Sequence, residues 1–152
     1  MRVLSDTNIF ISYLLSPPGS AGTISRLVEA ALIGEFTLLL PKELLAELAE
    51  KLRTSRKLNR RISVDESQEL IDLLRQAAVI LPTIAEVIPA VVRDPNDDYL
   101  IAQALLGNAD ILISRDKDLL SLKQVEYVQI LSPFQFVQRY LNDRRVEEHA
   151  LQ

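Results

Sequence analysis

Short unbroken runs of apolar residues alternate along the chain with longer segments in which apolar residues recur every three or four positions. Runs of the first kind are typical of strands buried on both faces of a sheet, and the longer segments are typical of amphipathic helices. The predicted strands comprise residues 3–4, 36–40, 79–81, 111–113 and 127–131. The predicted helices comprise residues 9–15, 22–33, 41–52, 63–78, 97–106 and 133–141.

Local signals mark where several of these helices begin and end. Pro41 suits the first position of a helix, because its missing N–H is no loss there. Ser63 is followed three residues later by Glu66, which resembles a capping box. Gly34 and Gly107 follow two periodic segments and are typical helix ends.

This alternation of strands and helices predicts the fold class. It favours a parallel sheet covered by helices on both faces. We therefore expect an α/β protein, a three-layer α/β/α sandwich with a central, mainly parallel sheet of about five strands. The chain has 152 residues, of which 48% are hydrophobic, enough for the core of one domain. We expect a single domain over residues 1–141 and a polar C-terminal tail over residues 142–152.

The composition limits the chemistry that this domain can perform. There is no cysteine and only one histidine, His149, so thiol catalysis and multi-histidine metal sites are excluded. No apolar stretch reaches the length of a membrane helix. The apolar run at the N-terminus is interrupted at Ser5 and Asp6, too early for a signal peptide. We therefore expect a cytoplasmic protein that does not contact a membrane.

Acidic residues follow the predicted strands at the positions where α/β proteins place their functional crevices. Asp6 follows the first strand, and Asp116 and Asp118 follow the fourth. Asp97 and Asp98 begin the helix before that fourth strand. In open α/β sheets the crevice lies beyond the carboxyl ends of the strands, at the switch point of the topology. If the first and fourth strands are neighbours, these carboxylates converge there.

Converging carboxylates repel one another, and a hard divalent cation removes that conflict. Mg²⁺ and Mn²⁺ prefer oxygen ligands, and such an ion can polarise a phosphate and activate water without histidine or cysteine. A structural interpretation competes with this one for single members. Asp94, Asp97, Asp98 and Asp116 each stand where an aspartate commonly caps a helix.

Four blocks of sequence carry a resemblance to a known family. They are Val3–Asn8 (VLSDTN), Pro41–Leu48 (PKELLAEL), Arg93–Ala104 (RDPNDDYLIAQA) and Ala109–Leu120 (ADILISRDKDLL). In order and spacing they resemble the PIN-domain family, small metal-dependent ribonucleases common as toxins of toxin–antitoxin pairs. The resemblance covers residues 1 to about 140 and is greatest to the bacterial VapC-like toxin components.

The resemblance implies a quartet of acids that bind one or two Mg²⁺ or Mn²⁺ ions. The implied catalytic and metal-binding residues are Asp6, Glu47, Asp98 or Asp97, and Asp116. Glu47 fits the family's leucine–leucine–x–glutamate pattern better than Glu43 does. Asp98 ranks ahead of Asp97, because it stands three residues before the Ile-Ala pair of the motif. Asp118 is a looser neighbour of the fourth acid.

The resemblance gives supporting roles to Asn8 and Ser114, and the position of Arg115 before Asp116 makes it a further candidate. Asn8 either holds a water molecule on the metal or caps the helix that starts there, and both interpretations stay open. Ser114 stands where many relatives have threonine, and its hydroxyl is available to a ligand or to Asp6. Arg115 is a candidate for a phosphate contact, although a solvated arginine is the more common case.

A basic segment stands apart from the acidic remainder of the chain. The formal net charge is −4, from 17 basic and 21 acidic residues. Residues 51–61 are predicted to form a basic loop or short helix with no acid, and removing their six basic residues leaves 11 basic against 21 acidic residues, a charge of −10. The segment is a candidate to bind RNA phosphates, an acidic antitoxin segment or a second subunit, or to be a solvated arm. Its basic residues are Lys51, Arg53, Arg56, Lys57, Arg60 and Arg61.

The sequence thus predicts a Mg²⁺- or Mn²⁺-dependent endoribonuclease that acts as the toxin of a type II toxin–antitoxin pair. Its expected partners are RNA, a small antitoxin and further copies of itself in a homodimer or higher homo-oligomer. The alternative is a catalytically silent PIN-fold module that binds RNA or protein. A phosphatase on this sheet would require aspartate where Asn8 stands, and a phosphoreceiver would require an acid after the third strand, where Pro82 and Thr83 stand.

Overall fold

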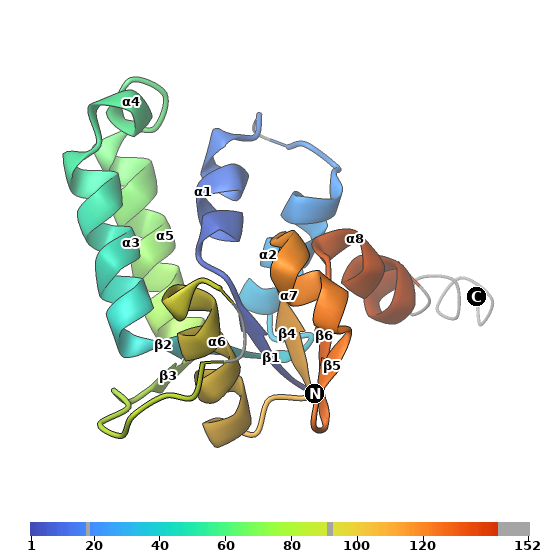
Figure 1. The fold of residues 1–152 in the computed structure, drawn as a ribbon. Helices are drawn as coiled ribbons and strands as arrows, with labels where there is room; N and C mark the ends of the chain where they lie inside the picture. Colours follow the sequence, from blue (N-terminus) through green and yellow to red (C-terminus); the bar gives the residue numbers. More distant parts are fainter. Residues whose placement is uncertain (18, 91–92, 143–152) are drawn as a thin grey trace.

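The computed structural model describes residues 1–17, 19–90 and 93–142. Figure 1 shows the arrangement of its helices and strands. In chain order the elements are β1 (Arg2–Ser5), α1 (Asn8–Leu15), α2 (Thr23–Leu32), β2 (Thr37–Pro41), α3 (Lys42–Thr54), α4 (Arg56–Asn59), α5 (Val64–Ala77), β3 (Val79–Leu81), α6 (Pro95–Leu106), β4 (Ile111–Ile113), α7 (Lys117–Leu122), β5 (Gln124–Val125), β6 (Val128–Leu131), α8 (Pro133–Phe136) and a π-helical turn, η1 (Val137–Asn142).

The described strands form one sheet in the order β3-β2-β1-β4-β6-β5. β1 lies in its interior and pairs in parallel with β2 on one side and with β4 on the other. Val3 is registered between Leu38 of β2 and Ile111 of β4, and all three side chains are buried. The first and fourth predicted strands are therefore neighbours, which meets the condition for the acids after them to converge.

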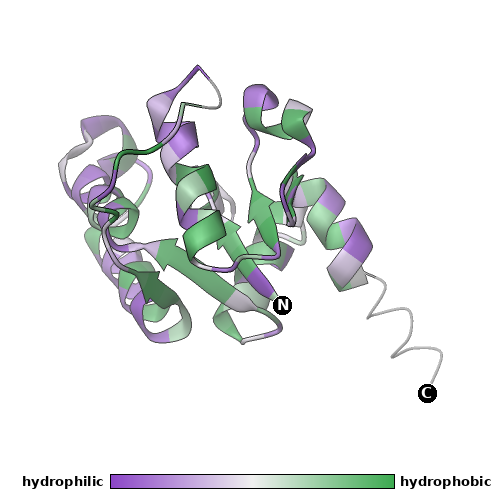
Figure 2. Ribbon diagram, turned by 60° about the horizontal axis from the view of Figure 1, so that its bottom comes forward, coloured by the Kyte–Doolittle hydropathy of each residue, from purple (hydrophilic) through white to green (hydrophobic). Residues whose placement is uncertain are grey.

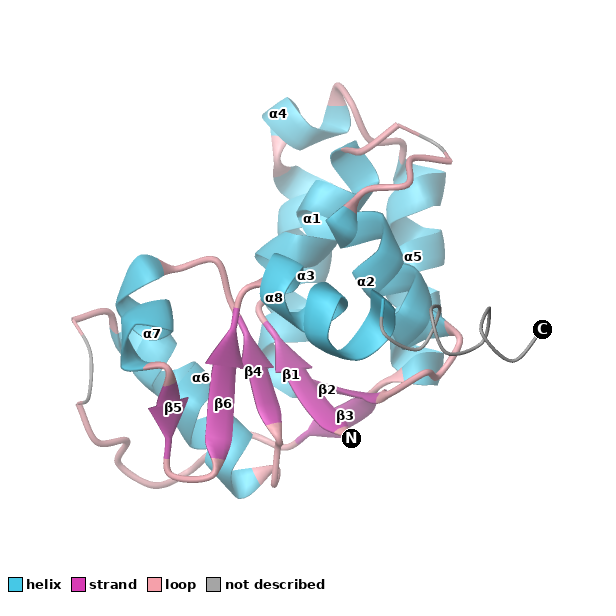
Figure 3. Cartoon of the chain, turned by 90° about the vertical axis from the view of Figure 1, so that its right-hand side faces the viewer, coloured by secondary structure: helices cyan, strands magenta, loops and turns pink. Residues whose placement is uncertain are grey.

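Helices cover both faces of this sheet, which confirms the predicted three-layer α/β sandwich (Figure 3). Val3 and Leu4 point to opposite faces, as successive strand residues do. Val3 belongs to the larger apolar cluster, with residues of α1, α2, α3, α5 and α8. Leu4 belongs to the smaller cluster, with residues of α6 and α7. Figure 2 shows the strands coloured as apolar and the helices as a mixture of apolar and polar residues.

The sheet has six strands rather than about five, because the sequence pattern does not reveal β5. β5 is two residues long and contains no apolar run, so it carries no periodic signal. It pairs antiparallel with β6 through a tight turn in which Glu126 has φ +51°, a value that side chains rarely adopt. The fifth predicted strand is β6, which begins at Val128 rather than at Tyr127.

Most predicted helix boundaries are confirmed to within one or two residues. Ser63 caps α5, and its Oγ accepts a hydrogen bond from the backbone N–H of Glu66 at 3.0 Å. Pro41 ends β2 and stands at the N-cap position of α3, so it does not open the helix as its first residue. The basic segment continues α3 to Thr54 and then forms the short helix α4.

Two expectations concern regions that the structure describes only in part. The polar tail over residues 142–152 lies outside the described residues, apart from Asn142 at the end of η1. Within the described ranges, no helix combines the length and the apolar character needed to cross a membrane.

A substitution at Gly107 tests how tightly the end of α6 packs against Leu81 of β3. A Cβ atom added there would lie 2.9 Å from the backbone oxygen of Gln103 and 3.0 Å from Leu81 Cδ1. We expect Gly107→Ala to lower the free energy of unfolding by about 1–3 kcal/mol, because neither neighbour can move freely. Urea denaturation measures this, with Gly22→Ala as control, since nothing lies within 4 Å of a Cβ atom there. Equal stability of the two variants would contradict the tight packing.

Candidate active site

A polar cleft of about 340 Å³ opens beyond the carboxyl ends of β1 and β4. It lies between the first turns of α1 and α6, the middle of α3 and the residues that precede α7. The lining residues are Asp6, Thr7, Asn8, Ile11, Leu44, Glu47, Leu48, Lys51, Asp94, Asn96, Asp97, Leu100 and Asp116. Four of the acids predicted from the sequence are thus brought together, from segments far apart in the chain.

The pairing of β1 with β4 positions two of these acids. Asp6 directly follows β1, and its backbone N–H donates to the oxygen of Ile113 at 3.1 Å, which extends the pairing. Its carboxylate accepts the backbone N–H of Asn8 at 3.2 Å. Asp116 caps α7 and accepts the N–H groups of Asp118 and Leu119 at 2.8 and 3.4 Å. The capping interpretation of Asp116 is confirmed, and the same carboxylate also lines the cleft.

Asp97, in the first turn of α6, is the most constrained carboxylate of the cleft. Asp97 is 6% exposed, and none of the residues described donates a hydrogen bond to its buried Oδ2. Burial raises the pKa of Asp97 from 3.8 to about 6, and the charges of Asp116, Asp94, Asp6 and Asp118 add to the rise. A bound proton or a bound cation would relieve the repulsion that Asp97 meets here.

The next acid, Asp98, is also buried but does not line the cleft. Successive helix residues lie about 100° apart around the axis, and of the two aspartates it is Asp97 that lines the cleft. The geometry therefore favours Asp97 over Asp98, the reverse of the order proposed from the motif. Asp94 acts as the N-cap of α6, with Oδ1 accepting the N–H of Asn96 at 2.9 Å, which confirms the capping interpretation for that residue.

The two glutamates of α3 are separated by the structure. Glu47 is exposed and lines the cleft. Glu43, one helical turn earlier, instead accepts a hydrogen bond from the hydroxyl of Tyr99. The geometry therefore agrees with the choice of Glu47 as the cleft residue.

Other polar residues line the cleft or support the acids, and only some of them could be predicted from the sequence. Asn8 lines the cleft as the first residue of α1, while Thr7 occupies the N-cap position, so the geometry does not favour the capping interpretation of Asn8. Ser114 is fully buried, and its Oγ accepts the backbone N–H of Asp116 at 3.0 Å. Its hydroxyl thus holds the turn that presents Asp116. Thr7 and Asn96 line the cleft without any signal in the sequence beyond their adjacency to acidic residues.

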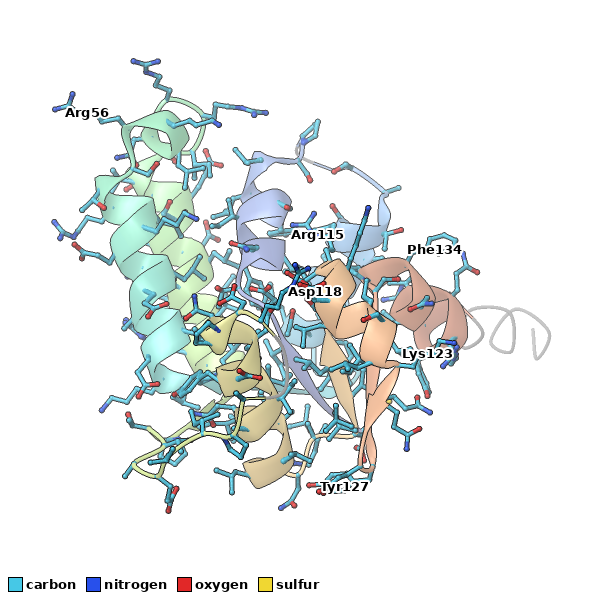
Figure 4. The ribbon with its side chains drawn as sticks, in the orientation of Figure 1. Arg56, Arg115, Asp118, Lys123, Tyr127 and Phe134 are labelled. Carbon is cyan, nitrogen blue, oxygen red and sulfur yellow. The ribbon has the colours of Figure 1, made fainter. Side chains whose placement is uncertain are left out.

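Arg93 and Arg115 directly precede two residues that line the cleft, Asp94 and Asp116. Arg115 donates to Ser12 Oγ at 2.7 Å and to the backbone oxygen of Asn8 at 3.4 Å, which fixes its guanidinium over the start of α1. Asp118 pairs with Arg93 at 3.1 Å and is absent from the cleft lining. Figure 4 shows Arg115 and Asp118 near each other in the middle of the molecule.

The basic segment is divided between the cleft and the far end of α3. Lys51 lines the cleft, and Arg53 pairs with Glu50 at 2.6 Å. The remaining four residues are exposed, and no side-chain partner is found for them among the residues described. We call these four the basic tip: Arg56, Lys57, Arg60 and Arg61. Figure 4 shows Arg56 at the outer end of the molecule, away from Arg115.

The donor chemistry of the cleft fits a hard divalent cation. Its carboxylates offer oxygen ligands, and Oδ2 of Asp97, which no described residue hydrogen-bonds, is free to serve as one of them. Within the described ranges, no three acidic side chains stand close enough, as they are oriented, to share one ion. Simultaneous coordination therefore requires rotation of carboxylates that already border the same cleft.

The like charges around Asp97 predict that the stability of the protein in EDTA depends on pH. Because the pKa of Asp97 is raised in the folded state, this group does not lower the free energy of unfolding below about pH 4. It lowers the free energy of unfolding increasingly as the pH rises to about 6. We expect the free energy of unfolding of Asp97→Asn to exceed that of the parent by about 1–3 kcal/mol above pH 6. Near pH 4 the two free energies of unfolding should be equal. Denaturant titrations across this pH range measure the difference.

The matched control for this measurement is Asp65→Asn, which removes an exposed acid from the first turn of α5. It should lower stability slightly at all pH values above 4, because it loses a favourable interaction with the helix dipole. Destabilisation of Asp97→Asn at every pH would contradict the repulsion inferred here.

Comparison with known proteins agrees with the arrangement described above. VapBC2 from Rickettsia felis, solved bound to a DNA fragment from its promoter, has a chain of similar fold with a TM-score of 0.55. The two chains are 17% identical over 87% of this chain and 98% of that one. No curated protein matches the chain in sequence. The family model described as PIN domain matches residues 2–118. That match covers β1 through the start of α7 and includes every acid of the cleft, so the chain belongs to the PIN-domain family.

Proposed function

We propose that the protein is a Mg²⁺- or Mn²⁺-dependent endoribonuclease and that the cleft is its active site. The observation that carries the proposal is the buried carboxylate of Asp97, which has a partnerless oxygen and faces the charges of Asp6 and Asp116. A fold does not require such a group, and retaining it favours a bound cation. The acids stand at the switch point of the sheet, where α/β enzymes bind their ligands.

The proposal assigns roles to polar residues in and around the cleft. Asp6, Asp97, Asp116 and Glu47 hold the cation, and Asp98 is the reserve candidate for the third acid. A cation held there supplies neutralisation of the phosphodiester charge and activation of water. Because the cleft contains no histidine, we assign proton transfer to the exposed Glu47. Asn8 and Lys51 orient the phosphodiester, and Arg115 contacts a flanking phosphate.

The biological setting belongs to the same proposal. The similarity in fold to a chain of VapBC2 supports a role as the toxin of a toxin–antitoxin pair, with a small antitoxin as partner. The family resemblance supports a homodimer or higher homo-oligomer. Both the reaction and the composition are consistent with a cytoplasmic protein.

Cleavage of a mixture of structured and single-stranded RNA by the purified protein tests the reaction. We expect cleavage with Mg²⁺ or Mn²⁺ and none in EDTA. Asp6→Asn and Asp97→Asn should each lower the cleavage rate by more than about 100-fold, because each removes a charged ligand. Asp65→Asn, prepared in the same way, should retain the parental rate.

The outcomes of this experiment separate the two candidate functions. Cleavage that survives in Asp6→Asn would assign the activity to another protein in the preparation. Absence of cleavage and of any rise in thermal stability with Mn²⁺ would favour the silent binding module over the nuclease.

The basic tip supports binding of the RNA backbone beside the cleft. Its four side chains lack ion-pair partners within the described parts of the chain, and the rest of the protein is acidic. α3 carries Glu47 and Lys51 at the cleft and ends at Thr54, about 10 Å along the helix from Glu47 at 1.5 Å per residue, and the basic tip follows in α4 and the residues after it. No aromatic residue lies in the segment, so contact is through phosphates rather than through stacked bases.

The salt dependence of RNA binding tests this part of the proposal. For Arg56→Gln with Arg60→Gln, we expect the slope of log affinity against log salt to fall by about 1.4, or about 0.7 per lost phosphate contact. Fluorescence anisotropy with a labelled single-stranded RNA in EDTA measures this slope. The control is Lys123→Gln, an exposed charge far from Arg56 (Figure 4). An unchanged slope would remove the tip from the RNA site and favour an acidic protein partner for it.

A further inference from the structure

A hydrogen-bonded bridge joins α3 to α6 beside the cleft. The hydroxyl of Tyr99 donates to Oε2 of Glu43, although 56 residues separate the two in sequence. Gln103 supports the tyrosine from the next turn of α6, where its Nε2 lies 2.8 Å from Tyr99 Oη and donates to the oxygen of Pro82 at 3.1 Å. Gln103 is 2% exposed, so the bridge is held from inside the protein.

The bridge joins the same two helices that carry two acids of the cleft. Tyr99 follows Asp97 by two residues in α6, and Glu43 precedes Glu47 by one turn in α3. Asp97 and Glu47 lie on different helices that both border the cleft. The distance between their carboxylates therefore depends on how α3 and α6 are held against each other.

Apolar packing links these two helices only weakly. Leu45, Leu48 and Leu52 of α3 pack in the larger cluster on one face of the sheet. The buried apolar residues of α6 pack in the smaller cluster on the other face. Leu44 is the part of α3 that packs against the smaller cluster. The Tyr99–Glu43 bridge adds a directional contact where the apolar contact is small.

An apolar contact between α3 and α6 would stabilise the protein more than this bridge does. Oε1 of Glu43 is buried and has no hydrogen-bond partner among the described residues. A half-satisfied carboxylate costs free energy that an apolar residue in its place would not. The hydrogen bonds that the bridge does make, from Gln103 to Tyr99 and from Tyr99 to Oε2 of Glu43, are directional and favour one relative placement of α3 and α6.

We propose that Tyr99, Glu43 and Gln103 are positioning residues, which fix α6 against α3 and so set the spacing of Asp97 and Glu47 for the cation. The proposal rests on the proposed function of the cleft. It gives Glu43 a role distinct from that of a metal ligand. None of the three residues touches the substrate in this assignment, and each acts through the two acids.

A matched pair of variants tests this role. Tyr99→Phe removes the hydroxyl of the bridge. Tyr127→Phe removes a hydroxyl that donates to the oxygen of Leu105 at 2.7 Å, at the opposite end of α6 and far from Asp118 (Figure 4). Both changes therefore remove a hydrogen bond that holds α6. Only Tyr99→Phe should weaken Mn²⁺ binding, by about tenfold, measured by isothermal titration calorimetry on the folded protein.

RNA cleavage kinetics give a second readout. For Tyr99→Phe we expect a kcat about tenfold lower and a KM for RNA within twofold of the parent, because the basic tip is unchanged. Glu43→Gln keeps an acceptor for the tyrosine hydroxyl and should retain most of the Mn²⁺ affinity. Glu43→Ala should match Tyr99→Phe, and the double variant should be no worse than either one, as expected for one shared contact.

The outcomes distinguish failure of the bridge from failure of the proposed function. If the parent binds Mn²⁺ and Tyr99→Phe binds it equally well, the bridge proposal is wrong and the active site stands. If both tyrosine variants lose affinity in parallel with stability, the bridge is structural only and the proposal also fails. If the parent neither binds Mn²⁺ nor cleaves RNA, the proposed function itself fails, and the bridge has no cation site to position.

Discussion

The structure depends on the parallel pairing of β1 with β4 in the interior of the sheet. The chain leaves these two strands toward the same edge, so the residues that follow them meet there whatever lies between them in sequence. Asp6 continues the pairing through its own backbone N–H, and Asp116 follows within three residues of the end of β4. The cleft is therefore a consequence of sheet topology, and α3 and α6 complete it from the two flanks.

Carboxylates gathered at one edge of the sheet repel one another, which lowers the free energy of unfolding. Hydrogen bonds from backbone N–H groups to three of them offset part of this loss. Asp6, Asp94 and Asp116 each accept a hydrogen bond from a backbone N–H group. No described residue donates to Oδ2 of Asp97, and burial together with the neighbouring carboxylates raises the pKa of Asp97 to about 6. A buried carboxylate perturbed by like charges in a cleft is typical of functional sites.

Sequence patterns predicted the layers and most helix boundaries, because each depends on local periodicity or on short-range caps such as Ser63. They missed β5, whose two residues pair through a turn with unusual backbone angles. They also ranked Asp98 above Asp97, because motif spacing carries no information on which way a side chain leaves the helix. The Tyr99–Glu43 bridge was invisible for a different reason, since it joins residues 56 apart with no pattern in common.

The division of charge along α3 has a consequence for how a large anion meets the protein. The helix begins near carboxylates and ends at the basic tip, so the molecule is an electric dipole superimposed on a negative net charge. A polyanion that diffuses toward it is repelled over most of the surface and attracted at one end. Rotation of the pair during approach then favours encounters in which the tip arrives first. Orientation is in this way selected before contact, and raising the ionic strength removes that selection because it shortens the range of the field.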